Sequence, residues 1–300
     1  MNEEYRPYLR KMSKEALIAC SLSEPPKFAS KQAESFYYTH IDILKNLAKP
    51  NSIKYKVSQL RDMLPCERKL QTEDTGHTFE YAICQYYDIL YKQEFKYDIQ
   101  RAKKIANKLK KSTIQLKGLT GTDIIHSADR HAKYDFTSSS GTVKIHAKTV
   151  KRYAAQMVAP EDIGQPCVSK FIQYFKLPIT YNRNQIKSWI IDNPVTFIIE
   201  EYKNLFDAPI CYFIEDKYEC YWITAIKKLN IDKKDISFSQ TVSEWNNNNT
   251  IYYKGISIAT VQFHAARGNM AIRFNFKTDM KWKSGIFVAF PGYFDIKKLF

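Results

Sequence analysis

The segment from residue 118 to residue 151 constrains the fold more than any other part of the chain. It reads as three short strands, GTDIIHS, AKYDFTS and TVKIHAKTV, and a Ser-Ser-Gly turn joins the last two. Segments with helical spacing precede and follow it, and further strand-like runs come later. We therefore predict an α/β (α+β) fold in which helices flank a mixed central β-sheet.

Two segments before these strands have the spacing of amphipathic helices. The first, TFEYAICQYYDILYKQ, carries Glu80 beside an apolar stripe of Phe79, Ile83, Tyr86 and Leu90. The second, IQRAKKIANKLKK, is expected to bury its apolar side chains and to turn its lysines toward solvent.

The second half of the chain is predicted to be richer in strands. AAQMVAPEDIGQPCVSKFIQYF reads as a loop that leads into a helix, and NRNQIKSWIID as a helix that ends at Asn193 and Pro194. Strand-like runs then follow: VTFIIE, ICYFIED, YECYWITAI, TIYYKGISIATVQFH and MAIRFNF. The asparagine run from residue 246 to 249 reads as a polar loop between strands.

The composition favours a polyanionic partner. Lys and Arg number 46 against 31 Asp and Glu, a formal charge of +15, so a positive surface is expected. The six cysteines are scattered without a CxxC pair, which argues against a zinc ribbon and a disulfide framework. No apolar run approaches the ~20 residues of a membrane helix, and the charged start of the chain lacks a hydrophobic stretch. We therefore predict a cytoplasmic protein that does not bind a membrane.

The three-strand segment also holds the most informative pair of charged residues. Asp135 and Lys148 lie in consecutive strands joined by a short turn, so they are expected to be neighbours. A carboxylate that binds a hard cation and a lysine that positions or deprotonates water suit metal-assisted hydrolysis of a phosphodiester. Asp123 is an alternative metal ligand, because it follows a glycine by two positions and opens a strand. His126, His131 and His146 have no regular spacing and are weak evidence for zinc.

These residues carry a resemblance to a known family. Asp135 followed by IHAKT, with Glu80 on an upstream helix and VAPEDIGQPCVSKF (158–171) downstream, resembles the PD-(D/E)xK nuclease superfamily, and within it the type II restriction endonucleases. The resemblance covers roughly residues 76–175.

The resemblance implies a specific activity and specific partners. It implies a homodimer that binds a short sequence in double-stranded DNA and hydrolyses one phosphodiester in each strand with Mg²⁺, leaving 5′-phosphate ends. A cognate DNA methyltransferase is expected to protect the host sites. Residues 1–300 would form one nuclease domain, with a helical part (about 1–70), a catalytic core (about 76–200) and a β-rich part (about 195–300) for DNA recognition.

One position departs from the family pattern. Where the family has an acid two residues before the lysine, this chain has His146, and a neutral imidazole is a poor ligand for Mg²⁺. Glu80 is the first candidate to complete the site, ahead of Glu161 and Asp162. His146 has three possible roles: acting on the water, contacting the phosphate or orienting another group. Three rivals stay open: a DNA-binding protein with a decayed nuclease site, a repair or transposition nuclease of the same superfamily, and a basic globular protein with no nucleic-acid role.

Two polar segments are candidates for reading DNA bases. Side chains such as Arg, Asn and Gln read base edges in the major groove, whereas lysines on phosphates carry no sequence information. NRNQIK and HAARGN both offer such groups, with ordinary polar turns as the alternative. The candidates are Asn182, Arg183, Asn184, Gln185, His264, Arg267 and Asn269.

Overall fold

The computed structural model describes residues 72–92, 98–128, 132–150, 156–160, 162–165, 167–266, 269–279 and 284–300. The chain divides into two units at the bond between Gln71 and Thr72, and every described residue lies in the second unit. The helical part expected at about 1–70 lies outside the described residues, so it stays a prediction, as does the single nuclease domain.

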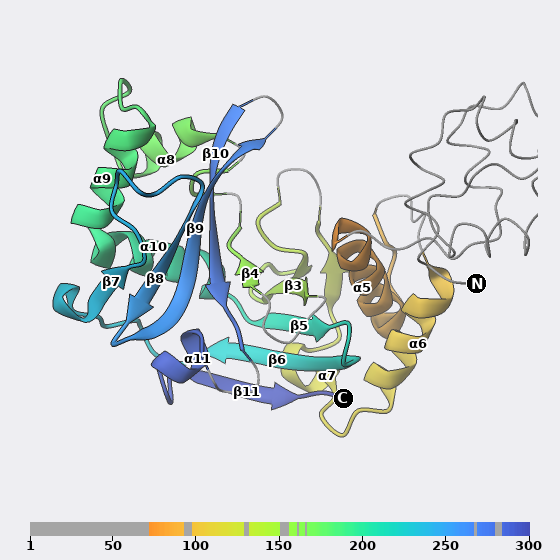
Figure 1. Ribbon diagram of the computed structural model, residues 1–300. Helices are drawn as coiled ribbons and strands as arrows, with labels where there is room; N and C mark the ends of the chain where they lie inside the picture. Colours follow the sequence, from red (N-terminus) through yellow and green to blue (C-terminus); the bar gives the residue numbers. More distant parts are fainter. Residues whose placement is uncertain are drawn as a thin grey trace, which may run out of the picture. The chain divides into compact units, whose positions relative to one another are not determined.

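Helices and strands alternate along the second unit (Figure 1). The helices are α5 (Thr72–Tyr87), α6 (Ile99–Lys110), α7 (Leu116–Thr120), α8 (Val168–Tyr174), α9 (Arg183–Asp192), α10 (Pro194–Phe206) and α11 (Ile286–Ala289), with a 3-10 turn at Lys233–Asp235. The first sheet has the order β1 (Ile124–His126), β2 (Phe136–Ser138), β3 (Lys144–Val150), β5 (Ile210–Ile214), β6 (Glu219–Ala225) and β11 (Phe294–Lys298). The second has the order β4 (Gln156–Val158), β10 (Asn269–Lys277), β9 (Ile256–Ala266), β8 (Asn248–Tyr253) and β7 (Ile236–Phe238).

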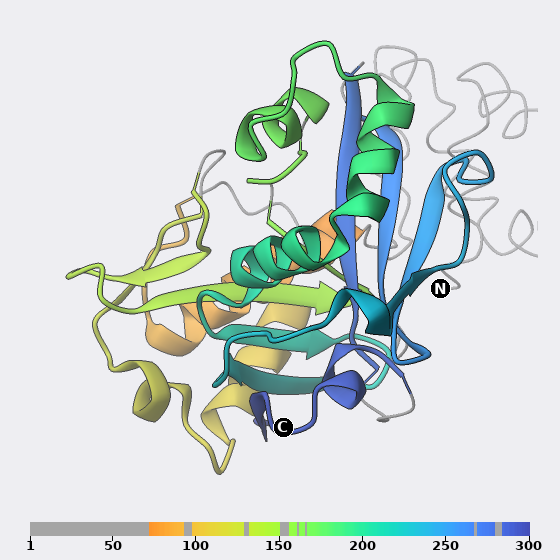
Figure 2. The ribbon, with the colours of Figure 1, turned by 90° about the vertical axis from the view of Figure 1, so that its left-hand side faces the viewer.

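The six-stranded sheet is mixed, as the sequence predicted. Strands β3 and β5 pair in parallel, and the other neighbours in this sheet pair antiparallel. The three strands predicted at 118–151 are β1, β2 and β3, in that order across the sheet. Figures 1 and 2 both show the long strands β9 and β10 of the second sheet running steeply across the strands of the first.

The two faces of the six-stranded sheet bury two different cores, because successive side chains of a strand point to opposite faces. On one face Ala147 and Phe213 pack with the apolar stripes of α5 and α6. On the other face Tyr212 and Ile214 pack with α10 and with the second sheet. Helices therefore flank the sheet as expected, and α5 lies directly against β3.

Three sequence-based assignments differ from the structure. The run VTFIIE is not a strand but the start of α10, with Pro194 at the first helical position. Its buried residues Phe197, Ile198, Glu201 and Leu205 have helical spacing, which only a longer window reveals. The asparagine run is a loop only in part, because Asn249 is buried within β8. Residues 156–158, read as loop, form β4.

Three further expectations concern the cysteines, the end of α5 and membrane-spanning helices. The four cysteines in the described residues, Cys84, Cys167, Cys211 and Cys220, are free thiols. Leu90 falls beyond the end of α5 and is 83% exposed, so the stripe predicted for that helix stops at Tyr86. Within the part of the chain that the structure describes, no helix has the length and apolar character needed to cross a membrane.

Gly164 provides a test of how the segment after β4 packs. Its φ is +81°, and a Cβ placed there would lie 2.9 Å from Ile272 Cβ and 3.0 Å from Ile272 O. We expect Gly164→Ala to lower the free energy of unfolding by about 1–3 kcal/mol, because both the backbone conformation and the space exclude a methyl group. Urea denaturation measures this change.

Gly118→Ala is the matched control. Gly118 lies in helix α7 and has no atom within 4 Å of the added Cβ. Alanine should leave the stability unchanged or raise it by up to about 1 kcal/mol. Equal effects of the two substitutions would contradict the packing of the 162–165 segment on β10.

Candidate functional site

Asp135 is fixed between two strands at the start of β2. Its backbone N–H donates to Ile145 O (3.1 Å), and its carbonyl accepts from Ser127 N (2.9 Å). The backbone N–H of Ala147 donates to Asp135 Oδ2 (2.7 Å). The β2–β3 register, in which Phe136 faces Ile145, thus holds the carboxylate against β3 beside Lys148.

Lys148 and Glu80 both lie close enough to Asp135 for their charges to affect its ionisation. Lys148 comes from β3 and is half-buried. Glu80 comes from α5, which is anchored by Phe79 stacked on Phe213 of β5 (ring centroids 5.3 Å apart). The three residues that the sequence singled out first therefore come together where α5, β2 and β3 meet. We call Glu80 and Asp135 the acidic pair.

The two carboxyl groups of the acidic pair differ in their ionisation. Burial and the nearby charge of Glu80 raise the pKa of Asp135, although Lys148 and the Ala147 N–H act in the opposite direction. Burial alone would also raise the pKa of Glu80, but the hydrogen bond with His126 and the nearby His77 lower it. Glu80 is thus held as a carboxylate next to a second acid that resists ionisation.

His146 has Asp207 as its hydrogen-bond partner, although its charge also acts on Asp135. Its side chain is fully buried, and its Nε2 lies 3.3 Å from Asp207 Oδ1. Asp207 also accepts from Tyr134 OH (2.7 Å) and forms an ion pair with Lys133 (2.9 Å). His146 is therefore an internal residue of β3, and its contacts within the described residues do not give it direct access to a phosphate.

Asp207 is a functional candidate that the sequence did not reveal. It lies between α10 and β5, the parallel neighbour of β3. The misreading of α10 as a strand hid this connection. The sequence DAPICYF places Asp207 just before a buried strand. Had α10 been assigned as a helix, this position would have marked Asp207 as a candidate.

The pKa of Asp207 allows its contribution to the stability of the fold to be tested by changing the pH. Burial alone would raise its pKa, but hydrogen bonds from His146, Lys133 and Tyr134 lower it to about 2 from 3.8. Because the pKa of Asp207 is lower in the folded protein than in the unfolded chain, its carboxylate stabilises the fold at any pH above the unfolded pKa. This stabilisation is lost as the pH falls from about 4 to about 2. We expect Asp207→Asn to cost on the order of 2 kcal/mol at pH 7.

Urea denaturation of both proteins from pH 7 to pH 3 checks this expectation. The difference in stability between the natural protein and Asp207→Asn should shrink below about pH 4, because Asp207 begins to be protonated in the unfolded chain. A difference that stays constant over this range would show that the carboxylate charge does not stabilise the fold.

Asp123 lies away from the acidic pair. It is exposed, and Ser139 Oγ donates to its Oδ1 (2.6 Å). Because β1 and β2 are antiparallel, Asp123 and Asp135 stand at opposite ends of the β1–β2 ladder. The structure thus brings Glu80, and not Asp123, to Asp135. Asp162 contacts Lys133 (3.4 Å), whereas Glu161 lies outside the described residues.

The two described histidines of the three-strand segment have different partners. His126 contacts Glu80 (3.3 Å), whereas His146 contacts Asp207, and His131 lies outside the described residues. Among the residues that the structure describes, no three His, Cys, Asp or Glu side chains cluster as a metal site.

The candidate base-reading residues of NRNQIK make contacts within the protein. Asn182 and Gln185 form a capping box at the start of α9. Arg183 donates to Asn247 Oδ1 (3.0 Å), and Asn184 Oδ1 accepts from Lys187 Nζ (3.4 Å). The Arg183 contact joins α9 to the loop before β8, whereas the other contacts are local to α9.

Of the HAARGN segment, residues 264–266 lie at the end of β9 and Asn269 begins β10, and these two strands pair antiparallel. His264 pairs with Ala271 across the two strands and is half-buried. Arg267 and the side chain of Asn269 lie outside the described part of the molecule. A role of these residues in reading bases stays a prediction.

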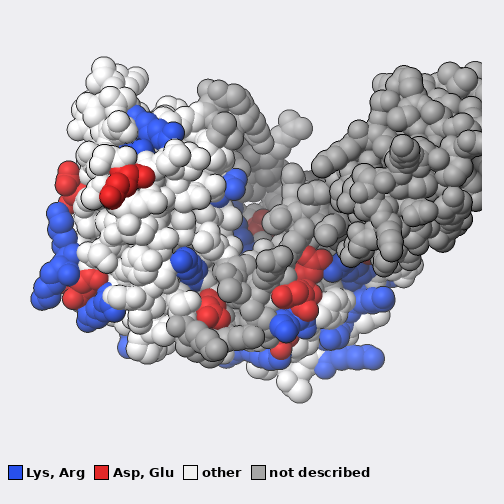
Figure 3. All heavy atoms as spheres, viewed as in Figure 1, with Lys and Arg blue, Asp and Glu red and all other residues white. Residues whose placement is uncertain are grey.

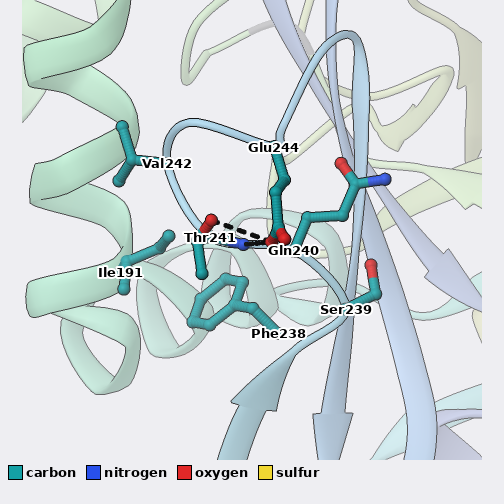
Figure 4. Close-up of a pocket in the computed structure, with 7 residues that line it drawn as sticks. All are labelled: Ile191, Phe238, Ser239, Gln240, Thr241, Val242 and Glu244. Carbon is teal, nitrogen blue, oxygen red and sulfur yellow. Dashed lines mark hydrogen bonds between the residues drawn. The ribbon is translucent and has the colours of Figure 1, made fainter.

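A pocket lies between α9 and the segment 238–244 (Figure 4). Its lining residues are Ile191, Phe238, Ser239, Gln240, Thr241, Val242 and Glu244. Glu244 is the charged residue among them, and it accepts hydrogen bonds from Thr241 N (2.9 Å) and Thr241 Oγ1 (2.8 Å). The pocket contains none of the candidate residues, and its acid already stabilises a turn.

Basic side chains gather on α6. Figure 3 shows Lys and Arg side chains over this helix, at the lower right of the view. As predicted, its lysines are exposed: Lys103, Lys104, Lys108, Lys110 and, at the C-cap, Lys111. They form a basic surface of the kind that contacts phosphate groups.

Comparison with known proteins finds a similar sequence among the type II restriction enzymes. The chain is 30% identical over 229 residues to the type II restriction enzyme CviAII of Paramecium bursaria Chlorella virus 1. The match covers 76% of this chain and 63% of the relative, so the chain spans less than two thirds of that enzyme's length. No family model and no solved structure matches the chain. The sequence that places Glu80, Asp135 and Lys148 together is thus related to that of a type II restriction enzyme.

Proposed function

We propose that this chain is a type II restriction endonuclease of the PD-(D/E)xK superfamily, which hydrolyses double-stranded DNA at a specific sequence with Mg²⁺. The observation that carries the proposal is the convergence of Asp135, Lys148 and Glu80 where α5, β2 and β3 meet. The similarity to the type II restriction enzyme CviAII supports the same reaction.

The acidic pair suits Mg²⁺. Proteins usually hold this ion through one or two carboxylates, and water or substrate phosphate completes its shell. The charge of Glu80 opposes ionisation of Asp135, and a divalent cation between the two would remove that repulsion. Bound there, Mg²⁺ would neutralise negative charge on the scissile phosphate and favour deprotonation of water.

Groups of the protein itself would orient the metal ligand, position the attacking water and stabilise the developing charge. The Ala147 N–H holds Asp135 Oδ2, so this carboxylate is already oriented before DNA binds. Lys148 would position the attacking water and stabilise the charge that develops on the phosphate. Direct in-line attack by water breaks the bond to the 3′ oxygen, which leaves a 5′-phosphate and a 3′-hydroxyl.

Double-stranded DNA is the proposed partner, and the proposed assembly is a homodimer. The formal charge of +15 and the lysines of α6 favour a polyanion, so binding should weaken steeply as salt rises. A dimer with two-fold symmetry matches a palindromic site, with one active site for each strand. Protection of the host DNA would need a methyltransferase that modifies the same sequence.

A second candidate is a DNA-binding protein whose nuclease site has decayed. The observation that favours it is His146, which stands where the family has an acid and is buried against Asp207. This candidate predicts salt-dependent DNA binding without cleavage.

Supercoiled plasmid DNA separates the two candidates. The endonuclease should linearise the plasmid with Mg²⁺, be inactive with EDTA, and leave ends that a ligase can rejoin only while they carry the 5′-phosphate. Binding without nicking would favour the decayed site. Cutting that depends on DNA structure instead of sequence would favour a repair or transposition nuclease.

A further inference from the structure

His126 contacts the acidic pair through Glu80. It is the last residue of β1, and its side chain is almost fully buried. Its Nε2 lies 3.3 Å from Glu80 Oε2, and its Nδ1 lies 3.1 Å from the backbone nitrogen of Lys92. Each ring nitrogen therefore has a defined partner.

These two partners determine where the ring carries its proton. A backbone N–H can only donate, so Nδ1 of His126 accepts from Lys92 and carries no hydrogen. In a neutral imidazole the hydrogen is then on Nε2. The group opposite Nε2 is the carboxylate of Glu80, which can only accept. Both hydrogen bonds therefore require the same tautomer, in which Nε2–H donates to Glu80.

The imidazole ring is also held in place by its neighbours. Tyr91 stacks on it, with ring centroids 4.5 Å apart and an interplanar angle of 21°. Phe136, the residue after Asp135, packs on it at 5.2 Å. A ring fixed in this way cannot turn to release Glu80 without disturbing the strand that carries Asp135.

The contacts of Glu80 all involve the same oxygen. Within the described residues, the hydrogen bond and ion pairs of Glu80 use Oε2, including the 3.9 Å contact with His77 Nδ1. No described residue is seen to form a hydrogen bond or ion pair with Oε1, so this oxygen can take a ligand. A carboxylate with one oxygen held and the other available is suited to bind a cation through a single oxygen.

We infer that His126 is a positioning residue, whose Nε2–H holds Glu80 so that Glu80 and Asp135 bind one divalent cation together. This inference rests on the proposed function, because the cation is the one used for cleavage. Outer partners of metal ligands orient those ligands, and their loss commonly weakens metal binding by about 10–100-fold.

The matched substitutions are His126→Phe and His126→Gln. Phenylalanine keeps an aromatic ring between Tyr91 and Phe136 but has no donor for Glu80. Glutamine can place an amide N–H near the position of Nε2. Thermal unfolding followed by circular dichroism establishes that each variant is folded before it is used.

The affinity for Mn²⁺, measured by isothermal titration calorimetry without DNA, provides the main test. We expect His126→Phe to weaken Mn²⁺ binding by about 10–100-fold and His126→Gln to retain most of it. Asp135→Asn should lose binding. If Asp135→Asn loses Mn²⁺ while His126→Phe binds like the natural protein, the role of His126 is wrong and the metal site stands. If the natural protein does not bind Mn²⁺, the proposed function fails, and the inference fails with it.

The ring ¹⁵N chemical shifts of His126 in the natural protein provide a second test that needs no variant. We expect the pattern of the neutral Nε2–H tautomer. The Nδ1–H tautomer would overturn the inference even if Mn²⁺ binds, because Nε2 would then have no hydrogen to donate to Glu80.

Discussion

Replacing Lys148 by alanine is expected to lower the rate of Mg²⁺-dependent DNA cleavage by about 10³-fold, within the range found when one preorganised acid–base or electrostatic group is removed. Lys148 is the lysine beside Asp135, and its charge is the largest influence opposing the rise in the pKa of that carboxyl. In the proposed mechanism, its loss would remove the cation that positions the water and stabilises the charge on the phosphate. Single-turnover cleavage at saturating protein measures the chemical step.

Lys144→Ala is the matched control, because Lys144 lies on the same strand but is exposed. It packs against the ring of Tyr134 (5.0 Å to the centroid) and not against the acidic pair. Cleavage by this variant should stay within a few-fold of the natural rate. Similar losses in both variants would indicate that the lysines of β3 contribute to DNA binding and that Lys148 has no particular role in the chemistry.

Asp135→Asn should remove cleavage to a similar or greater extent, at least about 10³-fold, because a neutral amide is a much weaker ligand for Mg²⁺ than a carboxylate. The substituted side chain would keep an oxygen for the Ala147 N–H, so the strand pairing should survive. Asp123→Asn is the control, since Asp123 lies at the other end of the β1–β2 ladder. Loss of cleavage in Asp123→Asn, with Asp135→Asn active, would move the metal ligand to Asp123.

The stability of Asp135→Asn separates a catalytic loss from a folding defect. The fold raises the pKa of Asp135, first through burial and also through Glu80, so ionising this carboxyl disfavours the folded state. Asparagine does not ionise. The metal-free variant should therefore be as stable as the natural protein near pH 7, or more stable. Such an exchange of stability for function is common at active sites.

The contacts that the sequence predicted well are local ones. The β2–β3 hairpin joins Asp135 to Lys148 across a short turn, and strand alternation fixes which residues face each other. The helical stripe of α5 was readable too, because Phe79, Ile83 and Tyr86 repeat at its period. The approach of Glu80 to Asp135, however, came from the family resemblance, since no local pattern shows which sheet face a helix covers.

The contacts that the sequence did not predict join distant segments. The parallel pairing of β3 with β5 depends on α8, α9 and α10 between them, and the apolar start of α10 resembles a buried strand. Because α10 was read as a strand, Asp207 was not recognised as the partner of His146. The contact of His126 with Glu80 spans 46 residues and depends on how α5 packs on the sheet.

Digestion of a long unmethylated DNA with Mg²⁺, followed by sequencing of the fragment ends, tests the central claim most directly. The natural protein should yield discrete fragments whose ends share one short sequence. Lys148→Ala and Asp135→Asn should yield none, while Lys144→Ala and Asp123→Asn should give the natural pattern. Intact DNA bound by the natural protein, or fragments that persist in both Lys148→Ala and Asp135→Asn, would contradict a restriction endonuclease centred on Asp135 and Lys148.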